Sequence, residues 1–287
     1  MFDFRYHALS LAAVFIALVV GLLLGVAIGD KELVSGAREE LRDSLRSEVR
    51  RADQERDEAL ARVREQDRFA DDAYPILTAE QLAGARIGLV LLGDDDGAPE
   101  IVRDALEPTG GELTFVAVVR QNIELAAIAE PARGTRYAKI ERQPTLLEDL
   151  GKRAAIQMVL GGRLVSRVSK ALLQSQSGFF GDLDGVIVMR SSDKPADKDA
   201  AQRLRELQDG IARGLLQTGA RVAGAERRGS EPSSIGWFRD RKLSSVDNLD
   251  EQAGRAALVF VLAGSEGTYG RRDSAEALLP PVVGRAR

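Results

Sequence analysis

A run of uncharged residues near the N-terminus constrains this chain more than any other feature. No charged side chain lies between His7 and Asp30, and almost all residues between them are apolar. A helix of about 22 residues is about 33 Å long, which is enough to cross a hydrocarbon layer of about 30 Å. The sequence therefore predicts a short flank over residues 1–7 and a transmembrane helix over residues 8–29.

Two other interpretations of this run stay open. A secretory signal has an apolar core of about 7 to 15 residues before a small-residue cleavage site, and Ala27-Ile28-Gly29 resembles such a site. A core helix of a soluble domain is also apolar on every face, but seldom over this length. Length favours a permanent anchor over both, and cleavage of the span stays open.

The flanking charges predict the orientation of the span. The charges before it, including the free amine, sum to about +1, and those of the first eleven residues after it sum to about −2. We therefore expect a cytoplasmic N-terminus and a main domain outside the cytoplasm. Tyr6 and His7 lie where aromatic rings favour the membrane interface, so we interpret both as anchors to lipid.

Three glycines inside the span are spaced four residues apart. Gly21, Gly25 and Gly29 fall on one face of a helix and would let a second helix approach closely. Glycine is also generally frequent in membrane helices, so the spacing alone does not require a partner. The pattern nevertheless favours packing of the span against a second copy.

Residues 30–72 predict a charged helical stalk. The segment from Leu33 to Arg68 contains no proline and is rich in Glu, Arg, Ala and Leu. A heptad repeat places apolar residues at its core positions, with arginine at 42 and 56 as interruptions: Leu45, Val49, Ala52, Ala59 and Val63. We expect a weak coiled coil and hence a homodimer, and we expect the helix to end between Asp71 and Pro75.

Composition excludes several classes of function. The chain has 287 residues, no cysteine, one histidine and a net charge of −4. It therefore lacks disulfides, thiol nucleophiles and thiolate metal sites, and it has no imidazole for a catalytic triad outside the membrane edge. Proteins that bind nucleic acid usually carry a basic domain, whereas this chain has a net negative charge, so we expect no nucleic-acid partner. We expect a protein that is not an enzyme.

Residues 75–287 alternate apolar runs with helical patterns, which predicts an α/β domain with a mostly parallel, Rossmann-like sheet. Within this domain we expect a flexible region over 226–250 and a C-terminal tail from residue 265. The expected strands are the following: Arg86–Leu92, Leu113–Val119, Gly185–Arg190, Ala220–Ala225 and Ala257–Gly264.

The loop after the first expected strand carries Asp94, Asp95 and Asp96. Three carboxylates can supply oxygen ligands to Mg²⁺ or Ca²⁺, but adjacent side chains rarely all face one ion. The other interpretation is a solvated loop in which Asp96 caps a helix with Pro99 in its first turn, and we favour it. No glycine-rich phosphate loop is present, so we expect no cofactor.

A second candidate site is a surface for a partner protein. Trp237 and Phe238 stand beside the basic residues Arg239 and Arg241. Aromatic and arginine side chains often anchor protein interfaces. Buried packing of the two rings and a solvated basic run are the alternative interpretation.

The order of these elements resembles one family. "RYHALSLAAVFIALVVGLLLG" at the start, "VDNLDEQAGRAALVFVLAG" over residues 246–264 and "GTYG" over residues 267–270 resemble the MctB family of actinobacterial copper transport outer-membrane proteins. The resemblance implies an envelope protein that limits intracellular copper, with copper as the transported ion. It also implies a link to cell separation, through division partners and regulators of peptidoglycan hydrolases. It brings no catalytic residue.

Two functions therefore follow from the sequence. The first is a membrane-anchored component of copper transport or homeostasis. The second is a membrane scaffold that binds partners in the cell envelope. The residues favour a helical anchor, since a membrane barrel needs many tilted strands of alternating polarity.

Overall fold

The computed structural model describes residues 4–191 and 195–281, and it places the side chains of residues 6–27, of 39–191 and of 195–281. The chain divides into two compact units, Met1–Asp67 and Arg68–Arg287. The described residues of the first unit all belong to helix α1 (Phe4–Thr78), and each of their described side chains is exposed. Residues Tyr6–Ala27 are long and apolar enough to cross a membrane, which agrees with the predicted N-terminal apolar helix.

Helix α1 continues to Thr78, so the predicted end between Asp71 and Pro75 is wrong. A proline inside a helix removes one backbone hydrogen bond, and packing can offset that loss. Tyr74, one residue earlier, is buried and its hydroxyl donates to the carbonyl of Ala105. The Thr78 hydroxyl donates to the Tyr74 carbonyl at 2.7 Å. These contacts lie within the second unit and hold the last turns of α1 in place.

The second unit is built on one seven-stranded sheet of order β3-β2-β1-β4-β5-β6-β7. Every neighbouring pair is parallel except β2 and β3, which are antiparallel. The mixed α/β class with a mostly parallel sheet is therefore confirmed. The strands are β1 (Arg86–Leu92), β2 (Glu112–Val119), β3 (Leu173–Gly178), β4 (Gly185–Arg190), β5 (Arg221–Ala225), β6 (Ser244–Val246) and β7 (Thr268–Tyr269).

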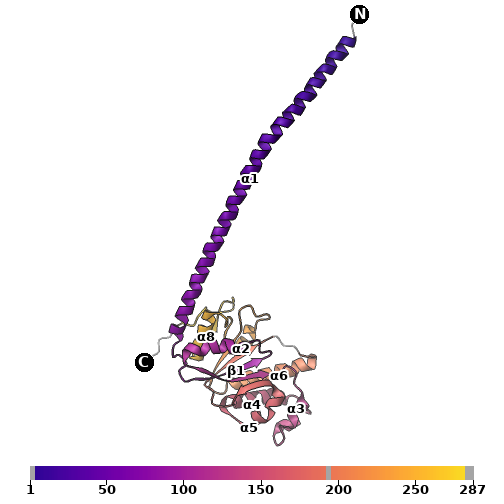
Figure 1. Cartoon of the computed structure of the whole chain (residues 1–287). Coiled ribbons are helices and arrows are strands. Elements are labelled where there is room, and N and C mark those ends of the chain that lie inside the picture. Colours follow the sequence, from indigo (N-terminus) through magenta and orange to yellow (C-terminus); the bar gives the residue numbers. More distant parts are fainter. Residues whose placement is uncertain (1–3, 192–194, 282–287) are drawn as a thin grey trace. The chain divides into compact units, whose positions relative to one another are not determined.

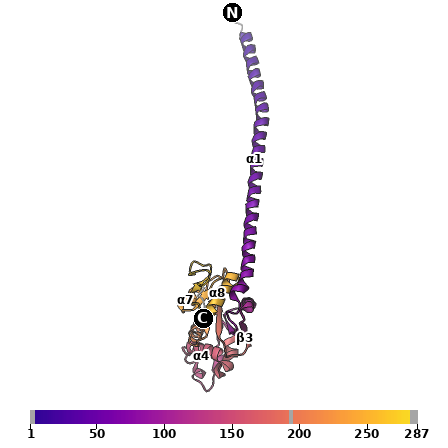
Figure 2. The same ribbon diagram turned by 90° about the vertical axis from the view of Figure 1, so that its left-hand side faces the viewer.

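Helices cover both faces of the sheet. Alternate residues of β1, such as Val90 and Leu91, enter two different hydrophobic cores, as expected for a strand buried on both faces. One core includes α2 (Ala98–Leu106) and α8 (Gln252–Leu262). In Figures 1 and 2, α8 and α4 lie on opposite sides of the strands. The other core includes α3 (Leu125–Ala129), α4 (Leu146–Leu160), α5 (Arg163–Leu172), α6 (Lys198–Leu215) and α7 (Ile235–Asp240).

Two short 3₁₀ turns, η1 (Glu107–Thr109) and η2 (Arg136–Lys139), connect these elements. Helices α4 and α6 pack closely on one another because glycines face the contact. A Cβ at Gly210 would lie 2.0 Å from the carbonyl oxygen of Glu148. This crossing closes the core on the α4 side of the sheet.

The expected strand over Ala257–Gly264 is wrong, because Ala257 to Leu262 belong to helix α8. Nearly every residue of this run is buried, so no polar face marks the helical period. Strand β3 was also missed, since residues 145–176 carry a helical pattern and β3 has the polar sequence LQSQSG. The segment 226–250, expected to be flexible, contains α7 and β6.

Candidate functional site

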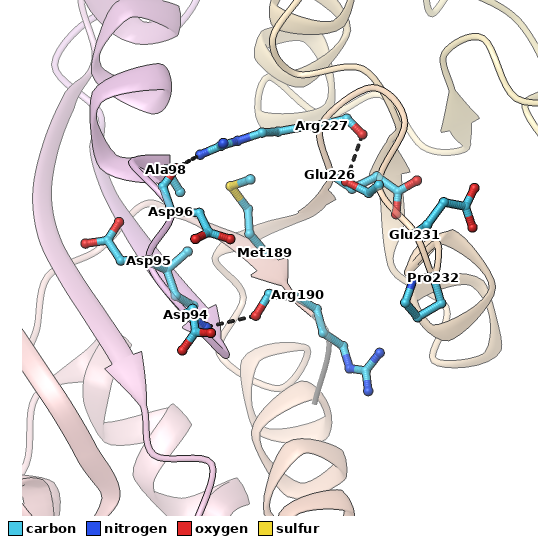
Figure 3. Close-up of a pocket in the computed structure, with 13 residues that line it drawn as sticks. Asp94, Asp95, Asp96, Ala98, Met189, Arg190, Glu226, Arg227, Glu231 and Pro232 are labelled. Carbon is cyan, nitrogen blue, oxygen red and sulfur yellow. Dashed lines mark hydrogen bonds between the residues drawn. The ribbon is translucent and has the colours of Figure 1, made fainter. Parts of the chain in front are cut away.

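A cavity of about 220 Å³ lies at the carboxyl ends of β1, β4 and β5. Strands β1 and β4 are neighbours, and the order of the sheet reverses between them. Open α/β sheets bind ligands at such a switch point. The cavity is therefore the candidate site of the domain (Figure 3), and its charged lining residues are Asp94, Asp95, Asp96, Arg190, Glu226, Arg227 and Glu231.

Hydrogen bonds tie together the loops that form the cavity. The backbone N–H of Asp94 donates to the Ser191 hydroxyl at 2.8 Å, which joins the loops after β1 and β4. The Arg227 guanidinium donates to the carbonyl oxygen of Asp96, which joins the loops after β1 and β5 (Figure 3). The cavity is thus formed by three connected loops on neighbouring strands.

The structure corrects the predicted helix cap. Helix α2 begins at Ala98 with Pro99 in its first turn, as expected, but its N-cap is Gly97, with no side-chain cap hydrogen bond. Asp96 has a φ of 43°, a left-handed conformation that aspartate tolerates better than most residues. Its carboxylate does not cap the helix.

The three aspartates do not form a cation site in the described residues. Their side chains point in different directions (Figure 3), and no group of three His, Asp or Glu side chains there could hold a metal ion. The hypothesis of a hard-cation site at Asp94, Asp95 and Asp96 therefore does not match the geometry. Carboxylates still outnumber arginines in the lining by five to two, so the cavity favours cations over phosphate groups.

Glu226 is the most buried charged residue of the cavity, and its side chain is 1% exposed. Its carboxylate accepts hydrogen bonds from the Ser233 hydroxyl at 2.9 Å, the Ser234 N–H at 2.6 Å and the Arg272 Nε at 2.7 Å. Burial opposes the charge of Arg272, but Glu226 and Glu231 raise the pKa of its guanidinium above the ordinary value. Glu226 therefore fixes the loop after β5 to the C-terminal segment, a role that no sequence motif indicated.

The C-terminal segment is also bound to the residues after β6. The Asp247 carboxylate accepts the backbone N–H groups of Arg271 and Arg272, each at 2.8 Å. Glu251 is partly buried, which works against its charge, but Arg271, Asn248 and Arg228 outweigh burial and hold its pKa below the ordinary value. The segments 246–251 and 268–272 thus meet beside the cavity.

The candidate partner surface around Trp237 is only partly exposed. Phe238 is fully buried against the core, so it cannot be an exposed anchor, and the prediction is corrected for this residue. Trp237 is half-buried, with the Arg241 guanidinium 4.1 Å from its ring centre. Arg241 also pairs with Asp209. Arg239 alone of the four candidates is exposed.

The candidate residues of the apolar helix are exposed wherever the structure describes their surroundings. The side chain of Tyr6 is 79% exposed, and His7 is exposed as well. A Cβ at Gly21 or Gly25 would meet no atom within 4 Å. The surroundings of Gly29 lie outside what the structure describes. Lipid anchoring and helix packing stay predictions.

The fold and cavity define a class: an α/β protein whose mostly parallel sheet follows one N-terminal apolar helix. The family model described as "Copper transport outer membrane protein, MctB" matches residues 1–280, and the chain belongs to this family. Two curated relatives named copper transporter MctB come from Mycobacterium bovis and Mycobacterium tuberculosis. Each is 25% identical over 306 aligned residues, which cover 94% of this chain and 96% of the relative.

Proposed function

We propose that this protein is a single-span membrane protein of the cell envelope that takes part in copper homeostasis. The family match supports this proposal most strongly, because it extends over residues 1–280 and so includes both the apolar helix and the entire sheet. The alignments with the two relatives named copper transporters extend over most of this chain as well. The strand order supports a Rossmann-like domain behind the anchor.

The proposal places the N-terminus in the cytoplasm and the α/β domain outside it. The more positive flank before the span supports this orientation. A single cysteine can test it, because the chain has none. Gln217 is exposed in the α/β domain. A Gln217→Cys variant should react with a membrane-impermeant maleimide on the outside of spheroplasts, and labelling only after lysis would contradict the orientation.

The residue inventory supports a part in a copper-handling assembly rather than tight copper binding by one chain. Copper sites use thiolate, thioether or imidazole ligands, and this chain has no cysteine and one histidine, at the edge of the span. The cavity offers carboxylates and the thioether of Met189. Carboxylates draw cations by charge but are hard ligands, a poor match to Cu(I).

Deletion of the gene tests the proposal. Cells without the protein should grow less well than the parent as copper is raised, with no comparable change for zinc. The full chain should restore growth, whereas residues 30–287 behind a cleaved secretion signal should not, because the proposed role needs the anchor. Equal copper tolerance of the deletion strain and its parent would contradict the proposal.

A second function, a membrane scaffold for envelope partners, is favoured by the exposed stalk. Every side chain from residue 39 to 67 is exposed, and an apolar stripe lies among the charges: Leu41, Leu45, Val49, Leu60 and Val63. An exposed apolar stripe on a helix gains stability when a second helix covers it. We propose that two copies pair in parallel here and present the stalk to division proteins or regulators of peptidoglycan hydrolases. Cells that fail to separate after deletion, with unchanged copper tolerance, would favour this function.

A further inference from the structure

Strand β3 forms an open edge of the sheet. It is the last strand in the sheet order, and among the described residues it pairs only with β2. All residues from Gln174 to Gly178 are exposed, although successive side chains of a strand point to opposite faces. In the part of the chain that the structure describes, neither face of this stretch is covered by a helix.

This edge lacks the features that usually protect an edge strand. Proteins block such edges with lysine, other charges, proline or a covering element, because alternate N–H and C=O groups point outward. The sequence of β3, LQSQSG, contains no charge and no proline. Its six residues span about 20 Å, which is long enough to pair with another strand. The backbone of β3 can therefore accept an added strand.

Positive charge surrounds the N-terminal end of β3. Helix α5 leads directly into the strand and contains no acidic residue. Its exposed residues Arg163, Arg167 and Lys170 lie on one helix face, and Arg120 reaches Lys170, with its Nε donating to the Lys170 carbonyl at 3.2 Å. Within the described residues, none of these four side chains forms an ion pair. Residues 120–170 carry ten lysines and arginines against five acids, in a chain of net charge −4.

The C-terminal end of β3 is apolar instead. Phe179 follows the strand and is 87% exposed, while the next residue, Phe180, packs on Phe115 at 5.3 Å between ring centres. Leu160 is 60% exposed and precedes Gly161, which contacts Gly181. An exposed aromatic ring beside an open strand is a typical anchor for a bound segment.

We propose that β3 accepts an added β-strand from a partner protein, an extended segment with acidic residues near Lys170 and an apolar residue near Phe179. Backbone pairing along an edge supplies affinity in such complexes, and flanking side chains supply specificity. A second copy of this chain offers no acidic residue in β3 to match this basic end, and parallel pairing of two β3 edges would bring their basic ends together. This surface is independent of the proposed role in copper homeostasis.

The test uses the full chain in nanodiscs and a fluorescent eight-residue peptide as the probe. The peptide alternates glutamate with threonine in one half and valine with phenylalanine in the other. Anisotropy should show saturable binding below about 1 mM, and hydrogen exchange should slow at residues 174–178. The same peptide with all of its backbone amides N-methylated keeps its charge but cannot donate hydrogen bonds from either edge, and it should not bind.

Charge reversal supplies a matched comparison. Lys170→Glu should weaken binding of the peptide by about fivefold or more, whereas Arg239→Glu, an equal charge change on exposed α7 surface, should change it less than about twofold. Phe179→Ser should weaken binding without changing the effect of salt. No binding up to about 1 mM, equal binding of the N-methylated peptide, or equal effects of the two charge reversals would overturn the proposal.

Discussion

Gly270 lies so close to the Asp247 carboxylate that no larger residue fits between the two. A Cβ at position 270 would be 2.0 Å from the Oδ1 atom of Asp247, and the φ of Gly270 is 139°. The two residues that follow donate their backbone N–H groups to the same carboxylate, each at 2.8 Å. The chain after β7 therefore wraps around a buried acid at the end of β6, and only glycine allows the turn.

Replacement of Gly270 should destabilise the α/β domain. The Gly270→Ala variant combines an unfavourable φ with a steric clash, and we expect a loss of at least about 2 kcal/mol in the free energy of unfolding. Fluorescence of Trp237, the single tryptophan, reports unfolding in urea. Gly236→Ala is the control, because a Cβ there meets nothing within 4 Å and its change should stay within about 0.5 kcal/mol. Equal effects of both variants would refute this account of the turn.

Removal of the Asp247 carboxylate should cost stability for a different reason. Asp247→Ala leaves the N–H groups of Arg271 and Arg272 without their acceptor, and hydrogen bonds to a charged group contribute about 1.5 to 3 kcal/mol each. Asp247→Asn keeps one carbonyl oxygen and should lose less. Urea denaturation of both variants checks the order, and an Asn variant less stable than the Ala variant would contradict it.

The stability of the second unit should fall at high pH because of Tyr74. Burial raises the pKa of the Tyr74 hydroxyl to about 12, against the opposing effects of the Arg255 charge and the Thr78 hydrogen bond. Between pH 10 and pH 12 the unfolded chain loses this proton while the folded chain keeps it. The contribution of Tyr74 to the free energy of unfolding is therefore fully present below pH 10. It is lost as the pH rises toward 12, and the loss amounts to about 2 to 3 kcal/mol.

Tyr74→Phe isolates that contribution. The variant lacks the hydroxyl, so its free energy of unfolding should fall less steeply than that of the wild type between pH 10 and pH 12. It should be less stable at pH 8, because the Ala105 carbonyl loses a donor. Tyr269, whose pKa is also raised by burial and by Glu276, is unchanged in both proteins. Identical slopes would show that Tyr74 ionises equally in both states.

Disulfide formation between introduced cysteines tests the proposed pairing of the stalk. Ala59 falls at a core position of the predicted heptads, whereas Ala61, two residues later, falls on the outer face. A disulfide needs Cα atoms within about 7 Å, so Ala59→Cys should crosslink two copies under mild oxidation in membranes and Ala61→Cys should not. Equal crosslinking of both variants, or none, would contradict a parallel coiled coil.

The sequence predicted the central strands well because they are apolar and bounded by turns. Strands β1 and β4 match their expected bounds, and the mostly parallel sheet follows from the alternation of strands with helices. Helix α8 was mistaken for a strand because burial on nearly all sides hides the helical period. Strands β6 and β7 have three and two residues, too few for any periodic signal.

The candidate site was only partly predictable. Asp94 to Asp96 line the cavity because parallel strands present their carboxyl ends at one edge, but the sequence favoured a solvated loop at these residues. Sequence could not show that the N-cap is Gly97, since that depends on the φ of Asp96. Nor could it show the contact between Glu226 and Arg272, which are 46 residues apart and meet only through the fold.

The copper content of cells is the most direct readout of a role in copper homeostasis. Mass spectrometry of washed cells grown at a fixed, sublethal copper concentration would compare the parent, the deletion strain and the deletion strain carrying the full chain. We expect deletion to raise cell-associated copper about twofold or more, the full chain to reverse the rise, and zinc to stay unchanged. Equal copper content in all three strains, together with cells that fail to separate, would contradict the copper role and support the scaffold function.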